Sequence, residues 1–246
     1  MKTSLPRVTH IVELIDESPM VRTLVLGLEL EADPGQFVMA WLPGLDEKPF
    51  SLVRADPVTL TVARVGPFST AVHALGAGDR LWLRGPLGQP FALPPVGPSG
   101  PRAPLLLIGG GYGVAPLHFV AERARLSGWA ASMVIGARTA ADVILAGRFE
   151  ALGVRVTITT DDGSLGERGV ATGAAERLLD EEAHEAIYAC GPEPMLEAVE
   201  LLARRRGLPA QLSYERTMRC GLGVCGSCAR EGWLVCSDGP VRHLGV

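Results

Sequence analysis

The sequence predicts a β + α/β protein: an antiparallel β-barrel domain, a doubly wound parallel-sheet domain, and a small C-terminal segment. Three observations predict this class. Short apolar runs separated by turn residues fill the first ninety residues, and strand and helix patterns alternate after a proline-rich stretch. Four of the five cysteines then fall near the C-terminus, in a segment too small to hold a core of its own.

The composition of the 246 residues is typical of a globular protein. Hydrophobic residues make up 47% and charged residues 20%, which is enough apolar material for a packed core and excludes a disordered chain. The net charge of −4 comes without a basic stripe, which argues against a nucleic-acid partner. The first residues carry no apolar signal-peptide stretch, and glycines and prolines interrupt the charge-free run 103–121, so we expect a cytoplasmic protein with no membrane span.

The first half predicts an antiparallel barrel or sandwich of short strands, with one helical turn around Ser69–Leu75. The expected strands are Arg7–Leu14, Val21–Leu28, Gln36–Leu42, Phe50–Arg54, Thr59–Val65 and Arg80–Arg84. Five prolines then fall in residues 91–104, which predicts a stiff, extended connector between domains. We therefore expect a barrel domain over 1–96, an α/β domain over 97–212 and a cysteine segment over 213–246.

The second half alternates strands with helices, as in βαβ units that build a parallel sheet. The expected strands are Leu105–Ile108, Ser132–Ile135, Val154–Thr159 and Ala186–Ala189. The expected helices are Ala115–Leu126, Ala140–Leu152, Gly173–Leu179 and Glu193–Arg205.

The cysteine segment carries the most specific motif. Cys220, Cys225 and Cys228 have the C-x4-C-x2-C spacing of plant-type [2Fe–2S] ligation, and Cys236 supplies the fourth thiolate. Glycines between them let the backbone curl around the cluster and turn N–H groups toward it. The alternative is a structural zinc site with four cysteine ligands.

A glycine loop follows the first strand of the α/β domain. Gly109, Gly110, Gly111 and Gly113 allow a tight turn before a helix, and the helix N-terminus there would stabilise a pyrophosphate. The loop departs from G-x-G-x-x-G because Val114 holds the last glycine position, and no acidic residue follows the second strand directly. Taken alone, the loop is a weak signal, because a glycine-rich turn between a strand and a helix can also be purely structural.

Two further motifs are ambiguous by themselves. One follows the fourth strand of the α/β domain, where an open parallel sheet binds ligands, although a lone cysteine there can simply be a small apolar residue: Cys190, Gly191 and Pro192. The other opens a barrel strand, where a cation and a hydroxyl can hold a flavin or merely form a surface turn: Lys48, Pro49, Phe50 and Ser51.

The chemistry connects these motifs. A nicotinamide exchanges a hydride, whereas a [2Fe–2S] centre carries one electron at a time, so a flavin is expected between the two. The barrel is the domain left to bind it. No His–carboxylate set stands out, and we assign no catalytic residues, because hydride exchange with a flavin needs positioning more than acid–base groups.

Together these residues resemble the ferredoxin-reductase family, and within it the electron-transfer subunits of class 1B (NAD-dependent) dihydroorotate dehydrogenase. The shared stretches are Lys48–Ser51, Gly85–Gly88, Gly109–Pro116, Thr160–Ser164, Cys190–Pro192 and Glu215–Cys228. The sequence departs from the family at three places. Lys48 stands where the family usually has Arg, Ser69 stands where it has Gly, and only seven residues separate Cys228 from Cys236.

The resemblance implies where cofactors bind. FAD would lie against Lys48, Pro49, Phe50, Ser51, Val62, Ala63, Arg64, Ser69 and Thr70. NAD would lie against the glycine loop and Cys190–Pro192, with NADH preferred over NADPH, and the four cysteines would bind the cluster. The resemblance also implies an FMN-containing catalytic partner subunit in a heterotetramer, with electrons passing from dihydroorotate to NAD in pyrimidine biosynthesis.

Two alternatives remain open from the sequence. The same cofactors would suit an NAD(P)H–ferredoxin reductase or the flavin subunit of a hydrogenase complex. The other alternative is of another class: a zinc-stabilised binding module that has the same fold but no redox activity.

Overall fold

The computed structural model describes residues 5–95 and 102–245, which form two compact units. The first comprises the chain up to Pro90 together with Arg216–Pro240, and the second comprises Phe91–Glu215 together with the last strand. The expected boundary after residue 96 lies outside the described residues. The segment 213–246, expected as a third, terminal segment without a core of its own, is divided between the two units.

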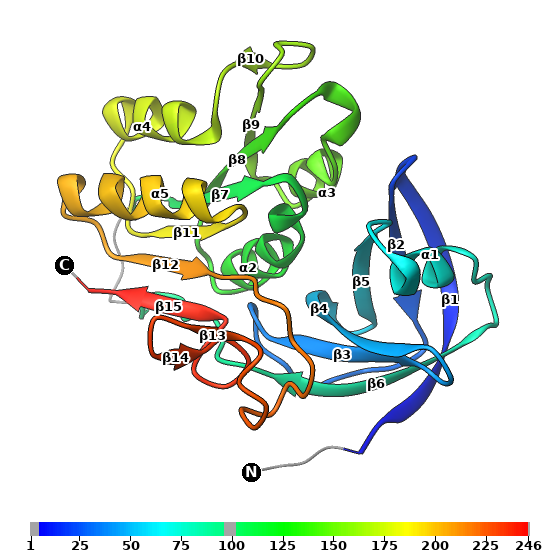
Figure 1. Ribbon diagram of the computed structural model, residues 1–246. Coiled ribbons are helices and arrows are strands. Elements are labelled where there is room, and N and C mark those ends of the chain that lie inside the picture. The colour runs from blue at the N-terminus through cyan, green and yellow to red at the C-terminus, as the bar shows by residue number, and fades with distance from the viewer. Residues whose placement is uncertain (1–4, 96–101, 246) are drawn as a thin grey trace. The chain divides into compact units, whose positions relative to one another are not determined.

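The first unit is built on a closed six-stranded antiparallel barrel, which confirms the predicted class and excludes a sandwich (Figure 1). Its strands follow the order β1-β2-β5-β4-β3-β6, and β6 pairs with β1 to close it. Their bounds are β1 Arg7–Ser18, β2 Val21–Leu26, β3 Phe37–Leu42, β4 Asp46–Ala55, β5 Val58–Ala63 and β6 Arg80–Leu87, with helix α1 at Pro67–His73.

Alternating side chains fill the barrel interior. Leu24, Met39, Leu52 and Leu60 have no exposed surface, and each such side chain stabilises the fold by about 1.5–3 kcal/mol. β4 begins four residues earlier than predicted because β3 and β4 pair as far as Leu42 and Asp46, which leaves only a three-residue turn. The motif at Lys48–Ser51 therefore lies inside a strand rather than at its start.

The cysteine segment packs on this barrel and forms a small hairpin of β13, Ala229–Arg230, and β14, Trp233–Leu234. The Arg84 guanidinium donates to the carbonyl of Cys220 at 2.7 Å, and the N–H of Gln89 donates to the carbonyl of Gly239 at 2.6 Å. These long-range bonds explain why the segment belongs to the barrel unit, which a local sequence pattern does not reveal.

The second unit contains a seven-stranded sheet in the order β10-β9-β8-β7-β11-β12-β15. All strands run parallel except β15, which pairs antiparallel with β12. Their bounds are β7 Leu105–Gly110, β8 Ala131–Ala137, β9 Arg155–Thr160, β10 Glu167–Arg168, β11 Ile187–Cys190, β12 Ala210–Ser213 and β15 Val241–Leu244. Strands β10, β12 and β15 add to the four that the sequence predicted.

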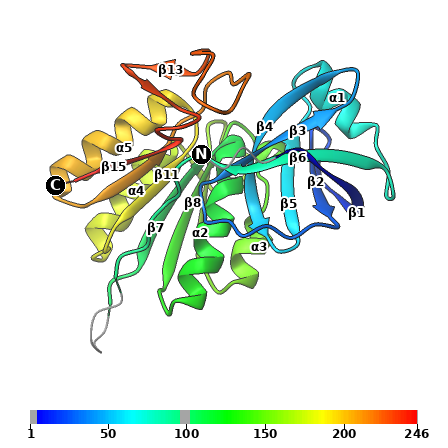
Figure 2. The same cartoon turned by 90° about the horizontal axis from the view of Figure 1, so that it is seen from below.

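Helices cover both faces of this sheet, as Figures 1 and 2 show, so it is doubly wound as predicted. α2 (Val114–Leu126) and α3 (Ala146–Ala151) pack on one face, and α4 (Ala171–Glu181) and α5 (Glu193–Arg206) pack on the other. Short 3-10 turns, η1 and η2, occupy Gly111–Gly113 and Ala140–Asp142. Among the described residues, no helix is both long and apolar enough to cross a membrane.

The helix predicted over 140–152 is wrong in its first half. Leu145 adopts a left-handed backbone conformation with φ 61°, and the chain between η2 and α3 is extended at Val143. Ile144 and Leu145 are both buried, so the burial of these side chains overrides local helix propensity there. The break leaves Asp142 at the end of the 3-10 turn that follows β8.

Candidate functional site

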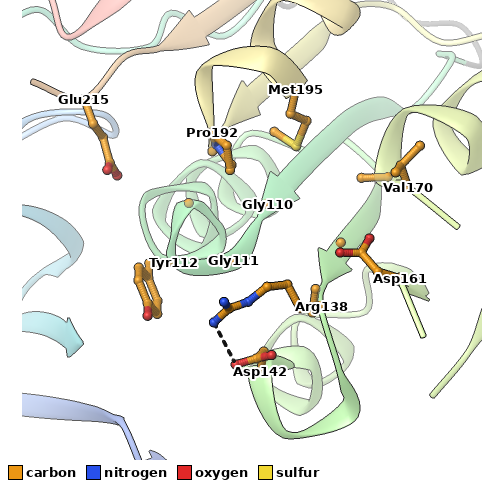
Figure 3. Close-up of a pocket in the computed structure, with 15 residues that line it drawn as sticks. Gly110, Gly111, Tyr112, Arg138, Asp142, Asp161, Val170, Pro192, Met195 and Glu215 are labelled. Carbon is orange, nitrogen blue, oxygen red and sulfur yellow. Dashed lines mark ion pairs between the residues drawn. The ribbon is translucent and has the colours of Figure 1, made fainter. Parts of the chain in front are cut away.

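The second unit contains a cavity of about 410 Å³ at the carboxyl ends of the parallel strands (Figure 3). β7 pairs with β8 on one side and with β11 on the other, so the strand order reverses here, where open α/β sheets bind ligands. The lining residues come from the ends of β7 and β8, from the loops and first helical turns that follow β7, β8, β9, β10 and β11, and from the second residue after β12: Gly110–Gly113, Gly136–Arg138, Asp142, Asp161, Val170, Ala171, Gly191, Pro192, Met195 and Glu215.

The glycine loop has two physical roles. A Cβ at Gly113 would lie 2.1 Å from the carbonyl oxygen of Cys190, and a Cβ at Gly110 would lie 2.8 Å from the side chains of Pro192 and Met195. These glycines therefore let the β7 and β11 loops pack together. Gly111 instead has φ +54° and open space where a Cβ would point, which leaves room for a ligand at the N-terminus of α2.

Some of the residues predicted to bind the nucleotide line this cavity, and others lie behind the lining. Gly110, Gly111, Gly113, Gly191 and Pro192 line the cavity. Gly109 lies within β7, and Cys190 is buried at the end of β11, outside the lining set.

Burial dominates the electrostatics of the site. It raises the pKa of the Cys190 thiol, whose hydrogen bond to Ser213 opposes the shift only in part, so this side chain is a packing residue rather than a thiolate. Desolvation also raises the pKa of Glu215, which lines the cavity.

The four clustered cysteines lie in one looped segment of the first unit. Their sulfurs accept backbone N–H bonds from Leu222 and Cys225 to Cys220 Sγ at 3.4 and 3.5 Å, from Gly223 to Cys236 Sγ at 3.2 Å, and from Cys236 to Cys228 Sγ at 3.4 Å. N–H groups aimed at sulfur stabilise thiolates and tune the potential of iron–sulfur clusters. The donor set therefore fits a cluster.

The thiols interact in two pairs. Interaction with Cys220 contributes to the lowered pKa of Cys225, and interaction with Cys228 contributes to the raised pKa of Cys236. Within residues 5–95 and 102–245, no group of three or more His, Cys, Asp or Glu side chains is arranged around a single metal ion. A two-iron cluster divides four thiolates between its irons, and this pairing matches that division.

The exposed thiol has a lowered pKa. Hydrogen bonds from Ser227 lower the pKa of Cys225 to about 6, whereas burial raises the pKa of Cys236. Cys225 is exposed, while Cys228 and Cys236 are buried. One end of the thiol set thus faces solvent.

The first group of predicted flavin residues lies on β4, paired with β3. Lys48 Nζ forms an ion pair with Asp46 at 2.5 Å, and the hydrogen bond from Lys48 lowers the pKa of that carboxyl. Phe50 stacks on Phe68 of α1 with ring centroids 6.0 Å apart.

The second group follows β5 and enters α1. The hydroxyl of Ser69 is committed to its own turn, because it accepts from the N–H of Val65 and Gly66 at 2.9 and 3.0 Å and donates to the Gly66 carbonyl. Arg64 and Thr70 have exposed side chains. The structure therefore brings β4, β5 and α1 together, with Ser69 bracing the turn.

A second cavity, of about 960 Å³, lies elsewhere on the barrel unit and is lined by Leu5, Arg7, Glu29, Leu30, Glu31, Asp56, Gly85 and Pro86. It includes none of the nine predicted flavin residues.

Sequence reasoning missed several lining residues of the first cavity. Asp142, Asp161, Met195 and Glu215 lie in four separate loops or helices. The signal that finds Asp161 is its position one residue after β9, since the carboxyl ends of neighbouring parallel strands share one edge of the sheet.

Each of the two units contains a region that matches a known protein family. Residues 215–244 match the iron–sulfur cluster binding domain of dihydroorotate dehydrogenase B, which favours the cluster over zinc, and residues 107–201 match an oxidoreductase NAD-binding domain. A chain of an NADH-dependent reduced ferredoxin–NADP oxidoreductase superposes with a TM-score of 0.84 at 28% identity, covering 96% of this chain and 88% of that one.

Similarity to whole proteins extends over nearly the full chain. A relative from Methanocaldococcus jannaschii, described as a probable dihydroorotate dehydrogenase B (NAD(+)) electron transfer subunit, is 41% identical over 96% of this chain and 89% of its own length. A relative from Thermococcus kodakarensis with the same description is 43% identical over 96% and 95%. At this identity and coverage, with the cluster and nucleotide domains both matched, the chain belongs to the family of dihydroorotate dehydrogenase B electron-transfer subunits.

Proposed function

We propose that this chain takes electrons from an FMN-containing dihydroorotate dehydrogenase subunit and delivers them to NAD, using its [2Fe–2S] cluster and FAD. The two subunits would form a heterotetramer in the cytoplasm, where thiols stay reduced, and serve pyrimidine biosynthesis. One observation carries the proposal: four cysteines lie in one loop whose backbone N–H groups donate to their sulfurs, on a barrel of ferredoxin-reductase type, in a chain whose other unit is an NAD-binding domain.

When bound, the flavin supplies the exchange between hydride pairs and single electrons. The residues of the chain supply positioning. In this proposal Lys48–Ser51, Val62–Arg64 and Thr70 hold FAD on β4, β5 and α1, while Ser69 fixes the turn that presents Thr70. The Gly110, Gly113 and Gly191 contacts would hold open the space beside Gly111 for the pyrophosphate.

The exposed Cys225 end supports electron exchange with a partner at that point. Electron transfer between proteins is fast only at short distances, and among the other three thiols of the cluster set Cys220 is partly exposed while Cys228 and Cys236 are buried. Cys225→Ser is therefore the informative change, because an exposed position tolerates serine without repacking a core.

The test compares two activities in the same variant. With the catalytic subunit present, Cys225→Ser should abolish NAD reduction driven by dihydroorotate. Reduction of a dye by NADH through the flavin should stay largely intact in the chain alone. Cys190→Ala removes a cysteine outside the cluster set and should preserve iron content. Loss of dye reduction in a folded, flavin-bound Cys225→Ser protein would overturn the proposed order of carriers.

A second candidate function has one specific observation in its favour: the 28% identical chain of a ferredoxin–NADP oxidoreductase covers nearly the whole protein. On that basis a ferredoxin would replace the dihydroorotate-oxidising subunit as partner. NADH-dependent reduction of ferredoxin by the purified chain, with no stimulation by the catalytic subunit and dihydroorotate, would favour this candidate.

A further inference from the structure

The end of the nucleotide cavity away from Glu215 is lined by three charged side chains. Arg138 follows β8, Asp142 ends the 3-10 turn after it, and Asp161 follows β9 (Figure 3). Asp161 belongs to the stretch Thr160–Ser164, which the proposed function leaves without a role.

Backbone bonds lock the two loops together. The N–H of Asp161 donates to the carbonyl of Ala137 at 3.0 Å, and the N–H of Ala140 donates to the hydroxyl of Ser164 at 2.7 Å. Asp162 in turn accepts from the Ser164 hydroxyl and N–H, which holds the pKa of Asp162 below its usual value. The positions of Arg138 and Asp161 in the wall are therefore set by the fold before any ligand arrives.

Asp142 is oriented toward Arg138. One of its carboxylate oxygens accepts from the hydroxyl of Thr139 at 3.0 Å, and the other lies 3.9 Å from Nη2 of Arg138. The Arg138 side chain is 80% exposed, and Asp142 is the carboxylate paired with its guanidinium. With Asp161 included, two carboxylates and one guanidinium line this end of the cavity.

We propose that Asp142 and Asp161 make this cavity select NAD(H) over NADP(H). Asp142 contributes by forming an ion pair with the guanidinium of Arg138, which would otherwise bind a 2′-phosphate. The inference rests on the proposed function, which puts the dinucleotide in this cavity. A carboxylate accepts a hydrogen bond from a ribose hydroxyl and repels a phosphate at the same position. A nearby arginine favours the phosphate only when no carboxylate competes for it.

Two adenosine probes test this without relying on turnover. 5′-AMP and adenosine 2′,5′-bisphosphate differ only in the 2′-phosphate, and their binding to the flavin- and cluster-loaded chain is measured by calorimetry. The wild type should prefer 5′-AMP. Asp142→Asn and Asp161→Asn should each shift the affinity ratio toward the bisphosphate by about threefold to fivefold, the effect expected for one exposed charge pair.

Further variants separate the mechanism from a general charge effect. Arg138→Ala added to Asp142→Asn should cancel the gain for the bisphosphate, because the freed guanidinium is what binds it. Glu197→Gln on α5 removes the same charge at an exposed position outside the cavity and should leave the ratio unchanged. The ratio of kcat/KM for NADH and NADPH in dye reduction should follow the binding ratio.

The outcomes distinguish two failures. If 5′-AMP binds and competes with NADH but neither Asn variant changes the ratio, the charge selection proposed here is wrong. If 5′-AMP does not bind or does not compete with NADH, the nucleotide does not occupy this cavity, and that part of the proposed function fails instead.

Discussion

Arg84 on β6 and Glu47 on β4 form a two-pronged ion pair, with Nε–Oε1 at 3.1 Å and Nη2–Oε2 at 2.8 Å. The same Nη2 donates to the carbonyl of Cys220 at 2.7 Å. Only 12% of the Arg84 side chain and 23% of the Glu47 side chain are exposed. Glu47 directly precedes Lys48, the first of the residues on β4 proposed to bind the flavin. The Arg84 guanidinium therefore connects that part of β4 to the cysteine loop proposed to bind the cluster.

Arg84→Met should weaken iron retention more than flavin retention. The variant leaves the Glu47 carboxylate and the Cys220 carbonyl without their shared donor in a largely buried place, which costs about 3 kcal/mol. The free energy of unfolding, from denaturant titration, should fall by that order, and the iron-to-flavin ratio of purified protein should fall with it.

Arg22→Met is the matched control for this change. Arg22 also bridges a carboxylate and a backbone carbonyl in the barrel, those of Asp16 and His73 at 2.6 and 2.9 Å. Its loss should lower stability without lowering the iron-to-flavin ratio. An equal ratio in both variants would show that Arg84 does not position the cluster loop.

Gly111→Ala should impair NADH binding at little cost to the fold. The residue has φ +54°, so alanine there costs about 1–2 kcal/mol, and its Cβ would project into the space assigned to the nucleotide. We expect KM for NADH in dye reduction to rise by roughly tenfold.

Gly128→Ala provides the comparison, since Gly128 has φ +75° and equally open surroundings, but lies after α2 and outside the cavity lining. It should show the same loss of stability with KM unchanged. A rise in KM in both variants would assign the effect to general destabilisation.

Gly113→Ala should destabilise the second unit severely. Its Cβ would lie 2.1 Å from the carbonyl oxygen of Cys190, and this neighbour is backbone that cannot turn away, so a cost of about 3 kcal/mol or more is expected. Gly173→Ala on α4, where no atom lies within 4 Å of the added Cβ, should instead stabilise by up to about 1 kcal/mol. Thermal unfolding of the two variants should therefore move in opposite directions.

Local periodicity predicted the barrel and the sheet because their strands bury alternate or continuous apolar residues. The run Leu105–Ile108 is fully buried, as a central parallel strand requires. The cysteine spacing also predicted the cluster ligands, because three of the four ligands of such a cluster lie within a few residues of one another.

Long-range contacts are what the sequence did not reveal. The bond from Arg84 to Cys220 joins residues 136 positions apart, and no local pattern predicts that the cysteine segment packs on the barrel. Leu145 broke an otherwise helical pattern because tertiary packing determined its backbone. Asp142 and Asp161 could be placed in one cavity only once the parallel order of β8 and β9 was known.

His184 should make the stability of the second unit sensitive to pH. Its side chain is fully buried, with Nδ1 3.1 Å from the carbonyl oxygen of Glu182. Burial lowers the pKa of this imidazole below 6.5, although the Glu182 carbonyl and carboxylate oppose the shift. The folded state therefore binds a proton less readily than the unfolded chain does.

The sign of the effect follows from linkage. Between the folded pKa and about 6.5 the unfolded chain holds more protons, so stability is complete above this window and falls as pH drops through it. Wild type should lose up to about 1.4 kcal/mol per pH unit relative to His184→Gln, in urea titrations between pH 7.5 and 5.5. His243→Gln, which removes an exposed histidine on β15, should track the wild type. If the free energy of unfolding changed with pH in the same way in wild type and in His184→Gln, the buried imidazole would not cause the loss of stability at low pH.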